Sequence, residues 1–219
     1  MSKTTRNSQF VIPPPPGSSV AVRRIICVGR NYAAHALEMG RDPERERPFF
    51  FLKPADTVVD DGATVPCPPE TNNFHCEIEP VVAIGKGGAD IPVDRALEHV
   101  FGHGGATCSS GRASKDAPGT RGRRSTHPRP SRHSTPSPKP VIPGARIWLA
   151  VNGETKQDSD IAKLIWPVAA IVSIASRSMA LCPGGLFMTG TPEGVGPVRR
   201  GEVVTGGIDG LGEIKIAVH

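Results

Sequence analysis

Short apolar runs separated by turn residues dominate the hydrophobic pattern of the chain. Residues 73–85 alternate at first and then become wholly apolar, as in a strand that runs from a wet rim into a core. Residues 145–154 form a second such run and lead into an Asn-Gly turn signal. The pattern predicts further strands over residues 23–29, 49–54, 182–198 and 212–218.

Three segments show helical rather than alternating periodicity. Residues 32–40 follow Asn31, which the pattern predicts as the N-cap of a helix that Gly40 ends. Residues 93–102 also read as helical. Residues 164–181 have helical periodicity with Pro167 near the first turn, where proline is tolerated. Short strands with few helices predict an α+β fold.

Length and composition are consistent with a small globular protein. A chain of 219 residues suits one domain with a real core, and 25 Gly with 23 Pro indicates many turns. We expect residues 1–20 to be a flexible, Pro-rich N-terminal arm and residues 21–219 to form a single domain. No signal peptide or membrane span is expected. The five cysteines, which form no CxxC pair, predict free thiols and a cytoplasmic location.

The basic character of the chain belongs to one segment. Residues 103–140 contain eight Lys or Arg and one acidic residue, whereas the remaining sequence has 18 basic and 20 acidic residues. This segment also lacks any Val, Ile, Leu, Met, Phe, Trp or Tyr. Ordering it would cost about 1–2 kcal/mol per residue in backbone entropy with no hydrophobic return. We therefore expect a long disordered central loop.

The chain carries five motifs in order: CVGRNYAAHALEMG, FFFLKPAD, HCEIEPVVAIGKGGADIP, IWLAVNGE and TGTPEGVGP. Together they resemble the fumarylacetoacetate hydrolase family, and within it the bacterial fumarylpyruvate (acylpyruvate) hydrolase branch. The likeness covers roughly residues 20–102 and 141–218. The resemblance implies a mixed β-roll of the family's C-terminal-domain type, usually a homodimer. It also implies a cytoplasmic enzyme of aromatic catabolism that uses Mg²⁺ or Mn²⁺ to cleave a carbon–carbon bond in a diketo acid.

Residues 103–140 replace a stretch in which the family carries the run P-W-x-x-x-K-x-F-D-x-S-A-P. Reading codons for such a run one base late gives PGTRGRRSTHPRP, which stands at residues 118–130. We hypothesise that roughly 103–140 is an out-of-frame translation, with the frame restored near Val141. Sequencing the gene across codons 100–145 tests this: compensating insertions or deletions are expected, and an intact reading without them would refute the hypothesis.

Glu77 and Glu79 are the candidate metal ligands. At positions i and i+2 of a strand their side chains point to one face, and two carboxylates suit a hard divalent cation. The alternative is an ordinary solvated strand face. The resemblance implies metal carboxylates at these positions and a third ligand, an Asp. No Asp stands in the corresponding place, since Asp116 lies too far along the chain.

His35 and Glu38 are the candidate catalytic pair. Their i, i+3 spacing places them on one side of the predicted helix, where a carboxylate orients an imidazole and raises its basicity. Such spacing also occurs in surface pairs, but the resemblance implies a catalytic dyad on a lid. It further implies substrate binding by Thr191, whose alternative is a simple turn residue. Lys53 and Arg30 are further candidate anchors for a substrate carboxylate.

Three other interpretations remain open at this stage. Oxaloacetate decarboxylation would use the same metal and enolate chemistry. A catalytically dead family member would explain the damaged middle segment. Nucleic-acid binding could use the basic segment, although it has no aromatic residue for stacking, and a solvated charge run is the simpler account. The side chains that could contact phosphates are Arg121, Arg123, Arg124, Arg129 and Arg132.

Overall fold

The computed structural model describes residues 11–12, 20–40, 42, 47–58, 61–67, 73–111 and 144–219. Its strands are β1 Val11–Ile12, β2 Val20–Ala21, β3 Arg24–Gly29, β4 Phe49–Lys53, β5 Thr64–Val65, β6 Phe74–Ile84, β7 Val100–Gly111, β8 Arg146–Val151, β9 Glu154–Asp160, β10 Gly185–Met188, β11 Gly196–Pro197, β12 Val203–Ile208 and β13 Gly212–Val218. Its helices are α1 Ala33–Glu38 and α2 Val168–Ser178, with 3₁₀ turns η1 Ala55–Thr57, η2 Val93–His99 and η4 Ile161–Lys163. No helix in this part of the chain is long and apolar enough to cross a lipid bilayer.

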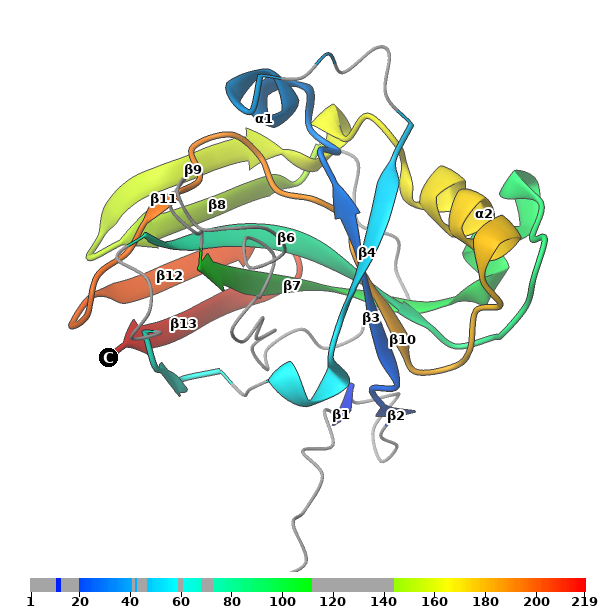
Figure 1. Cartoon of the computed structure of the whole chain (residues 1–219), viewed down its shortest axis with the longest axis horizontal. Coiled ribbons are helices and arrows are strands. Elements are labelled where there is room, and N and C mark those ends of the chain that lie inside the picture. The colour runs from blue at the N-terminus through cyan, green and yellow to red at the C-terminus, as the bar shows by residue number, and fades with distance from the viewer. Residues whose placement is uncertain are drawn as a thin grey trace, which may run out of the picture.

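Two sheets form the body of the described structure, and β6 connects them. One sheet has the order β11-β6-β10-β3-β4, with β7 along the other edge of β6; the second has the order β5-β13-β12-β8-β9. Figure 1 shows β6 and β7 running together from beside the second sheet toward α2. This is the mixed β architecture with few helices that the sequence predicts, and the fold class is confirmed.

Alternation along β6 distributes its side chains among three hydrophobic clusters. Cys76 and Ile78 pack with the second sheet, and Val82 and Ile84 pack with α2. Val81 belongs to a third cluster, which includes Ile25, Cys27 and Met188 on the opposite face of the first sheet. The apolar second half of β6 is therefore buried on both faces, as its continuous hydrophobic run predicts.

The Asn-Gly signal forms the turn that it predicts. Asn152 and Gly153 have φ values of 51° and 85° between the antiparallel strands β8 and β9. Both positive values are those of a type I′ turn, whose twist matches the flanking strands. The predicted strand over 145–154 thus ends at Val151, and a polar strand missed by the sequence pattern, β9, follows the turn.

Two helix expectations were partly wrong. Residues 93–102 do not form one helix: η2 ends at His99 and β7 begins at Val100. Residues 164–181 form α2 only over 168–178, after Pro167, which has no backbone N–H and takes an extended conformation as the N-cap.

The expected loop over 103–140 is wrong for its first nine residues. Residues 103–111 continue β7 and pair with β6 as far as Phe74 opposite Gly111. The segment brings no large apolar side chain, but its neighbours do: a Cβ on Gly105 would lie 3.3 Å from Ile208 Cδ1. Small residues therefore fit where a backbone ladder and packed neighbours supply the burial. Residues 112–140 lie outside the described residues.

The expected N-terminal arm, residues 1–20, is described only at residues 11, 12 and 20. β1, at residues 11–12, pairs antiparallel with β2, at residues 20–21. Residues 1–10 and 13–19 lie outside the described part of the chain. The remaining predicted strands over 23–29, 49–54, 182–198 and 212–218 correspond to β3, β4, β10 with β11, and β13.

Asn31 is not the N-cap of α1, contrary to the prediction. Tyr32 takes that position without a side-chain capping bond. The fully buried Asn31 amide instead donates to the carbonyls of Thr189 (2.8 Å) and Trp166 (3.0 Å) and accepts from Trp166 N–H (2.7 Å). One side chain thus joins the end of β3 to the segment after β10 and to the approach to α2.

Replacing Asn31 by Ala removes the partner of the buried Thr189 carbonyl and of the partly buried Trp166 carbonyl and N–H. We expect the free energy of unfolding to fall by about 3 kcal/mol, measured by urea unfolding. Arg95→Ala is the control: it breaks an exposed pair with Glu98 (3.0 Å) and should cost less than about 0.5 kcal/mol. A loss below about 1 kcal/mol for Asn31→Ala would contradict the structural role assigned to this amide.

Candidate metal and substrate site

The two candidate metal carboxylates lie on one face of β6, as the i, i+2 spacing predicts. Glu77 is opposite Cys108 and Glu79 is opposite Ala106 on β7. Glu79 is buried and Glu77 is half-buried. The Oε2 atom of Glu79 accepts a hydrogen bond from the backbone N–H of Gly190 at 2.7 Å. This bond fixes one oxygen of the buried carboxylate.

The segment after β10 lies directly against the β6 backbone. Thr189 donates to the carbonyl of Pro80 from both its backbone N–H and its hydroxyl, each at 3.0 Å. Gly190 has a φ of +106°, and a Cβ there would lie 2.8 Å from the Cβ of Asn31. Glycine is therefore required at this position, which brings its N–H to Glu79.

Cys27 and Lys53 share the electrostatic environment of the two carboxylates. Burial raises the pKa of the Cys27 thiol; Lys53 opposes this rise, and Glu79 and Glu77 add to it. Lys53 itself is buried at the end of β4, opposite Ile25 of β3. A buried ammonium near two carboxylates offsets part of their mutual repulsion. Lys53 and the two carboxylates thus act on the same buried thiol, and substrate binding by Lys53 remains a prediction.

His35 and Glu38 contact each other on α1. Nδ1 of His35 lies 3.1 Å from Oε2 of Glu38, and the imidazole is buried while Glu38 is partly exposed. The i, i+3 pairing predicted from the sequence is therefore present. When Nδ1–H donates to Glu38, the Nε2 nitrogen is left as the acceptor. The catalytic role of the pair remains a prediction.

Thr191 and Arg30 lie at two different places around the site. Thr191 is buried one residue beyond Gly190, and its hydroxyl accepts a hydrogen bond from Gln157 at 2.9 Å. Arg30 follows β3 with a φ of +60°, and its guanidinium carbon lies 4.9 Å from the centre of the Phe49 ring. The stacking holds Arg30 against β4. Substrate binding by either residue remains a prediction.

Sequence reasoning missed three polar residues next to this site. Tyr32, the chain's one tyrosine, is buried. Burial is the main cause that raises the pKa of its hydroxyl, and the charges of Asp160, Glu79 and Glu193 add to the rise. The Tyr32 hydroxyl and Oε2 of Glu193 are buried without a hydrogen-bond partner in the described structure. Gln157 stands in the polar strand β9. Only the rarity of tyrosine here could have drawn attention to any of them.

The described residues fit a divalent cation in part. Glu77 and Glu79 supply hard oxygen ligands on one face, which Mg²⁺ and Mn²⁺ prefer. No group of three or more His, Cys, Asp or Glu side chains in the described ranges is arranged to hold a metal ion. A third ligand of these four residue types is therefore absent from this part of the chain, and Asp116 lies outside it.

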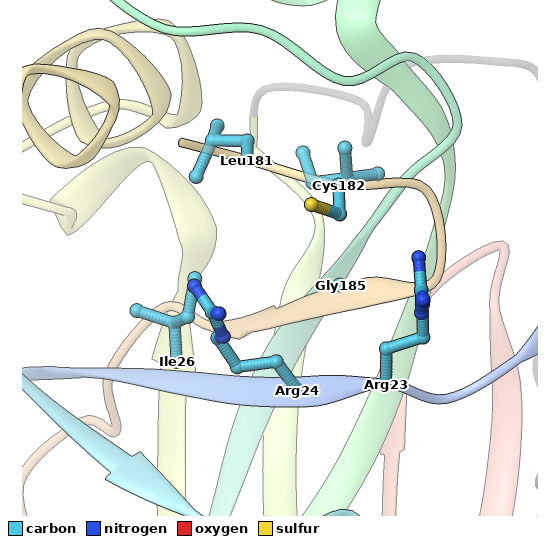
Figure 2. A pocket seen from close by; sticks show the side chains of 7 residues that line it. Arg23, Arg24, Ile26, Leu181, Cys182 and Gly185 are labelled. Atoms are coloured by element: carbon cyan, nitrogen blue, oxygen red, sulfur yellow. The ribbon is translucent and has the colours of Figure 1, made fainter. Parts of the chain in front are cut away.

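A surface cavity of ≈ 230 Å³ lies away from these residues. It is lined by Arg23, Arg24, Ile26, Ile84, Leu181, Cys182 and Gly185. Figure 2 shows the two arginines at the start of β3 extending toward the Cys182 segment. This end of β3 is opposite to the end that leads to Arg30. The cavity includes none of the predicted site residues and is not the candidate site.

The mixed β fold carries two carboxylates on one face of a single strand, a pair of donors that suits a hard divalent cation. Residues 24–219 match the family model described as fumarylacetoacetate (FAA) hydrolase C-terminal. The chain belongs to this family, whose members include divalent-metal-dependent hydrolases acting on carbon–carbon bonds.

Individual relatives narrow the comparison. The chain is 38% identical to a fumarylpyruvate hydrolase of Ralstonia sp over 188 residues, covering 82% of this chain and 98% of that protein. It is 35% identical to a mitochondrial oxaloacetate tautomerase FAHD1 of Arabidopsis thaliana, over 90% of this chain and 91% of that protein. The structure also matches the crystal structure of fumarylpyruvate hydrolase from Pseudomonas aeruginosa in complex with Mn²⁺ and pyruvate. The TM-score is 0.80 and the identity 42%, over 100% of this chain and 99% of that chain.

Proposed function

We propose that this protein is a hydrolase of fumarylpyruvate or a closely related acylpyruvate. The observation that carries the proposal is the pair Glu77 and Glu79 on one face of β6, with Glu79 held by the Gly190 N–H at 2.7 Å. Support comes from the fumarylpyruvate hydrolase relatives, one of which is a complex with Mn²⁺ and pyruvate.

The carboxylates and the buried Lys53 provide the charges of the proposed site. When bound at Glu77 and Glu79, Mg²⁺ or Mn²⁺ supplies positive charge that stabilises negative charge on the oxygens of a 2-oxo acid. Lys53, Arg30 and Thr191 are proposed to bind the substrate: the two cations attract its carboxylates, and the hydroxyl donates a hydrogen bond.

His35 is the proposed general base. Its partner Glu38, at 3.1 Å, orients the imidazole and stabilises the imidazolium that forms when His35 takes a proton from water. The water oxygen forms a bond to the distal carbonyl carbon of the acylpyruvate. The bond from that carbon to the methylene then breaks, and its electron pair passes to the pyruvate enolate. Protonation of the methylene carbon by the imidazolium completes pyruvate and regenerates His35.

Oxaloacetate is the second candidate substrate, favoured by the oxaloacetate tautomerase relatives. It is also a 2-oxo acid that forms an enolate, so the same residues could serve tautomerisation or decarboxylation. The proposal extends to a homodimer acting in the cytoplasm in aromatic catabolism. No disulfide joins Cys27, Cys67, Cys76 or Cys182 in the described structure, as expected for a reducing compartment.

The purified chain should be assayed with Mn²⁺ and with Mg²⁺ against fumarylpyruvate, other acylpyruvates and oxaloacetate. We expect turnover of an acylpyruvate that is abolished by EDTA and lowered at least ~100-fold in His35→Ala, because a positioned general base contributes on the order of 10²–10⁴ in rate. Fumarate and pyruvate formation are measured separately by chromatography.

Glu77→Gln and Glu98→Gln are a matched pair of variants, each of which removes one carboxylate charge. Glu98 is exposed on η2 and outside the site, so its variant should retain full activity, whereas Glu77→Gln should not. A chain with the family's central reading restored is assayed in parallel. Turnover by the restored chain alone would identify the present chain as catalytically dead; turnover of oxaloacetate alone would replace the first candidate with the second; and no turnover by either chain would refute the proposal.

A further inference from the structure

Gln157 connects the strand of the metal carboxylates to the segment that carries Thr191. It lies on β9 with about 1% of its surface exposed. Its Oε1 accepts from the backbone N–H of Ile78, the residue between Glu77 and Glu79, at 2.9 Å. Its Nε2 donates to the carbonyl of Pro192 at 2.8 Å and, at 3.3 Å, to that of Glu193. Backbone groups therefore surround this side-chain amide.

Those backbone contacts allow only one orientation of the amide. Ile78 N–H can only donate, so the atom facing it must be the oxygen. The carbonyls of Pro192 and Glu193 can only accept, so the atom facing them must be the nitrogen. A flipped amide would place two donors together at one end and two acceptors together at the other.

The fixed orientation determines what the Thr191 hydroxyl can do. Nε2 of Gln157 lies 2.9 Å from Thr191 Oγ1 and has only hydrogen atoms to offer, so the hydroxyl must accept here. The hydroxyl's own proton has no acceptor among the described residues. It is therefore available for a bond to an oxygen of a bound ligand.

Close backbone packing holds the segment in this position. Gly194 has a φ of +88°, and a Cβ there would collide with the carbonyl oxygen of Lys156. Gly190, at the other side of Thr191, donates to Glu79. Thr191 is therefore held between the β9 backbone and the metal carboxylate.

We propose that Gln157 is a positioning residue that makes Thr191 a hydrogen-bond donor toward an oxygen of an anionic 2-oxo acid. The inference rests on the proposed function, because it assigns the ligand oxygen to the acid bound at that site. Gln157 itself does not touch the ligand. Its effect on binding passes through the Thr191 hydroxyl.

A double-mutant cycle with Gln157→Met and Thr191→Val tests the proposal on the full chain. The measured quantity is the affinity of pyruvate for the Mn²⁺-loaded protein, by isothermal titration calorimetry. Each single variant should bind pyruvate about tenfold more weakly, the loss of one hydrogen bond to a charged group. The double variant should bind no more weakly than the weaker single variant, because both remove the same bond.

Two further variants separate positioning from folding. Thr191→Ser keeps the hydroxyl and should retain pyruvate affinity, and Lys156→Met, beside Gln157 on β9, should bind as the unsubstituted chain does. Should Gln157→Met fail to fold, Gln157→Glu replaces it. Burial and the facing carbonyls favour the protonated form of the introduced carboxyl, which can still donate to Thr191. Pyruvate affinity should therefore fall about tenfold as the pH is raised and that carboxyl ionises, because a carboxylate offers Thr191 no proton. Circular dichroism and Mn²⁺ affinity establish that each variant is intact.

Three outcomes would overturn the proposal. Unchanged pyruvate affinity in both Gln157 variants, while Thr191→Val weakens binding, would show that Gln157 does not act through Thr191. Additive losses in the double variant would show that the two residues act independently. Absence of pyruvate binding by the unsubstituted, Mn²⁺-loaded chain would overturn the proposed function as well, so the two failures are distinguishable.

Discussion

The hydrogen bond from the Gly190 N–H to Glu79 is the contact on which the geometry of the site depends. It joins two segments 111 residues apart and fixes one oxygen of a buried carboxylate. Burying an ionised carboxylate is costly unless it is hydrogen-bonded and compensated by positive charge. The glycine, the nearby buried Lys53 and a divalent cation would each reduce that cost. The same bond sets the position of Thr191, the following residue.

Strand β7 shows how much of this arrangement is formed by residues that precede position 112. It pairs with β6 along the whole stretch that carries Glu77 and Glu79, and it does so with residues up to Gly111. The strand pairing that positions the two carboxylates therefore uses only residues that precede the stretch outside the described structure. What the described residues do not supply is a third ligand. The fold of the site and its affinity for a cation are for this reason separate questions.

Local chemistry made part of this structure predictable from the sequence. The β6 strand, the Asn152–Gly153 turn and the His35–Glu38 contact each follow from a periodicity or spacing within a few residues. Asn31 and Gln157 could not be found this way, because their partners lie 135 and 158 residues away for Asn31, and 79 and 34 residues away for Gln157. β7 was missed because its burial comes from its neighbours and not from its own side chains.

Mn²⁺ binding to the purified full-length chain, followed by the electron paramagnetic resonance of the free ion, tests the central claim most directly. A single Mn²⁺ site is predicted. Its affinity should fall at least ~10-fold in Glu77→Gln and in Glu79→Gln, because the binding of a hard divalent cation depends on the charge of its ligands. Mg²⁺ should compete for it, and Glu98→Gln should leave it unchanged. Failure of the chain to bind Mn²⁺, or binding that neither site variant alters, would contradict the account.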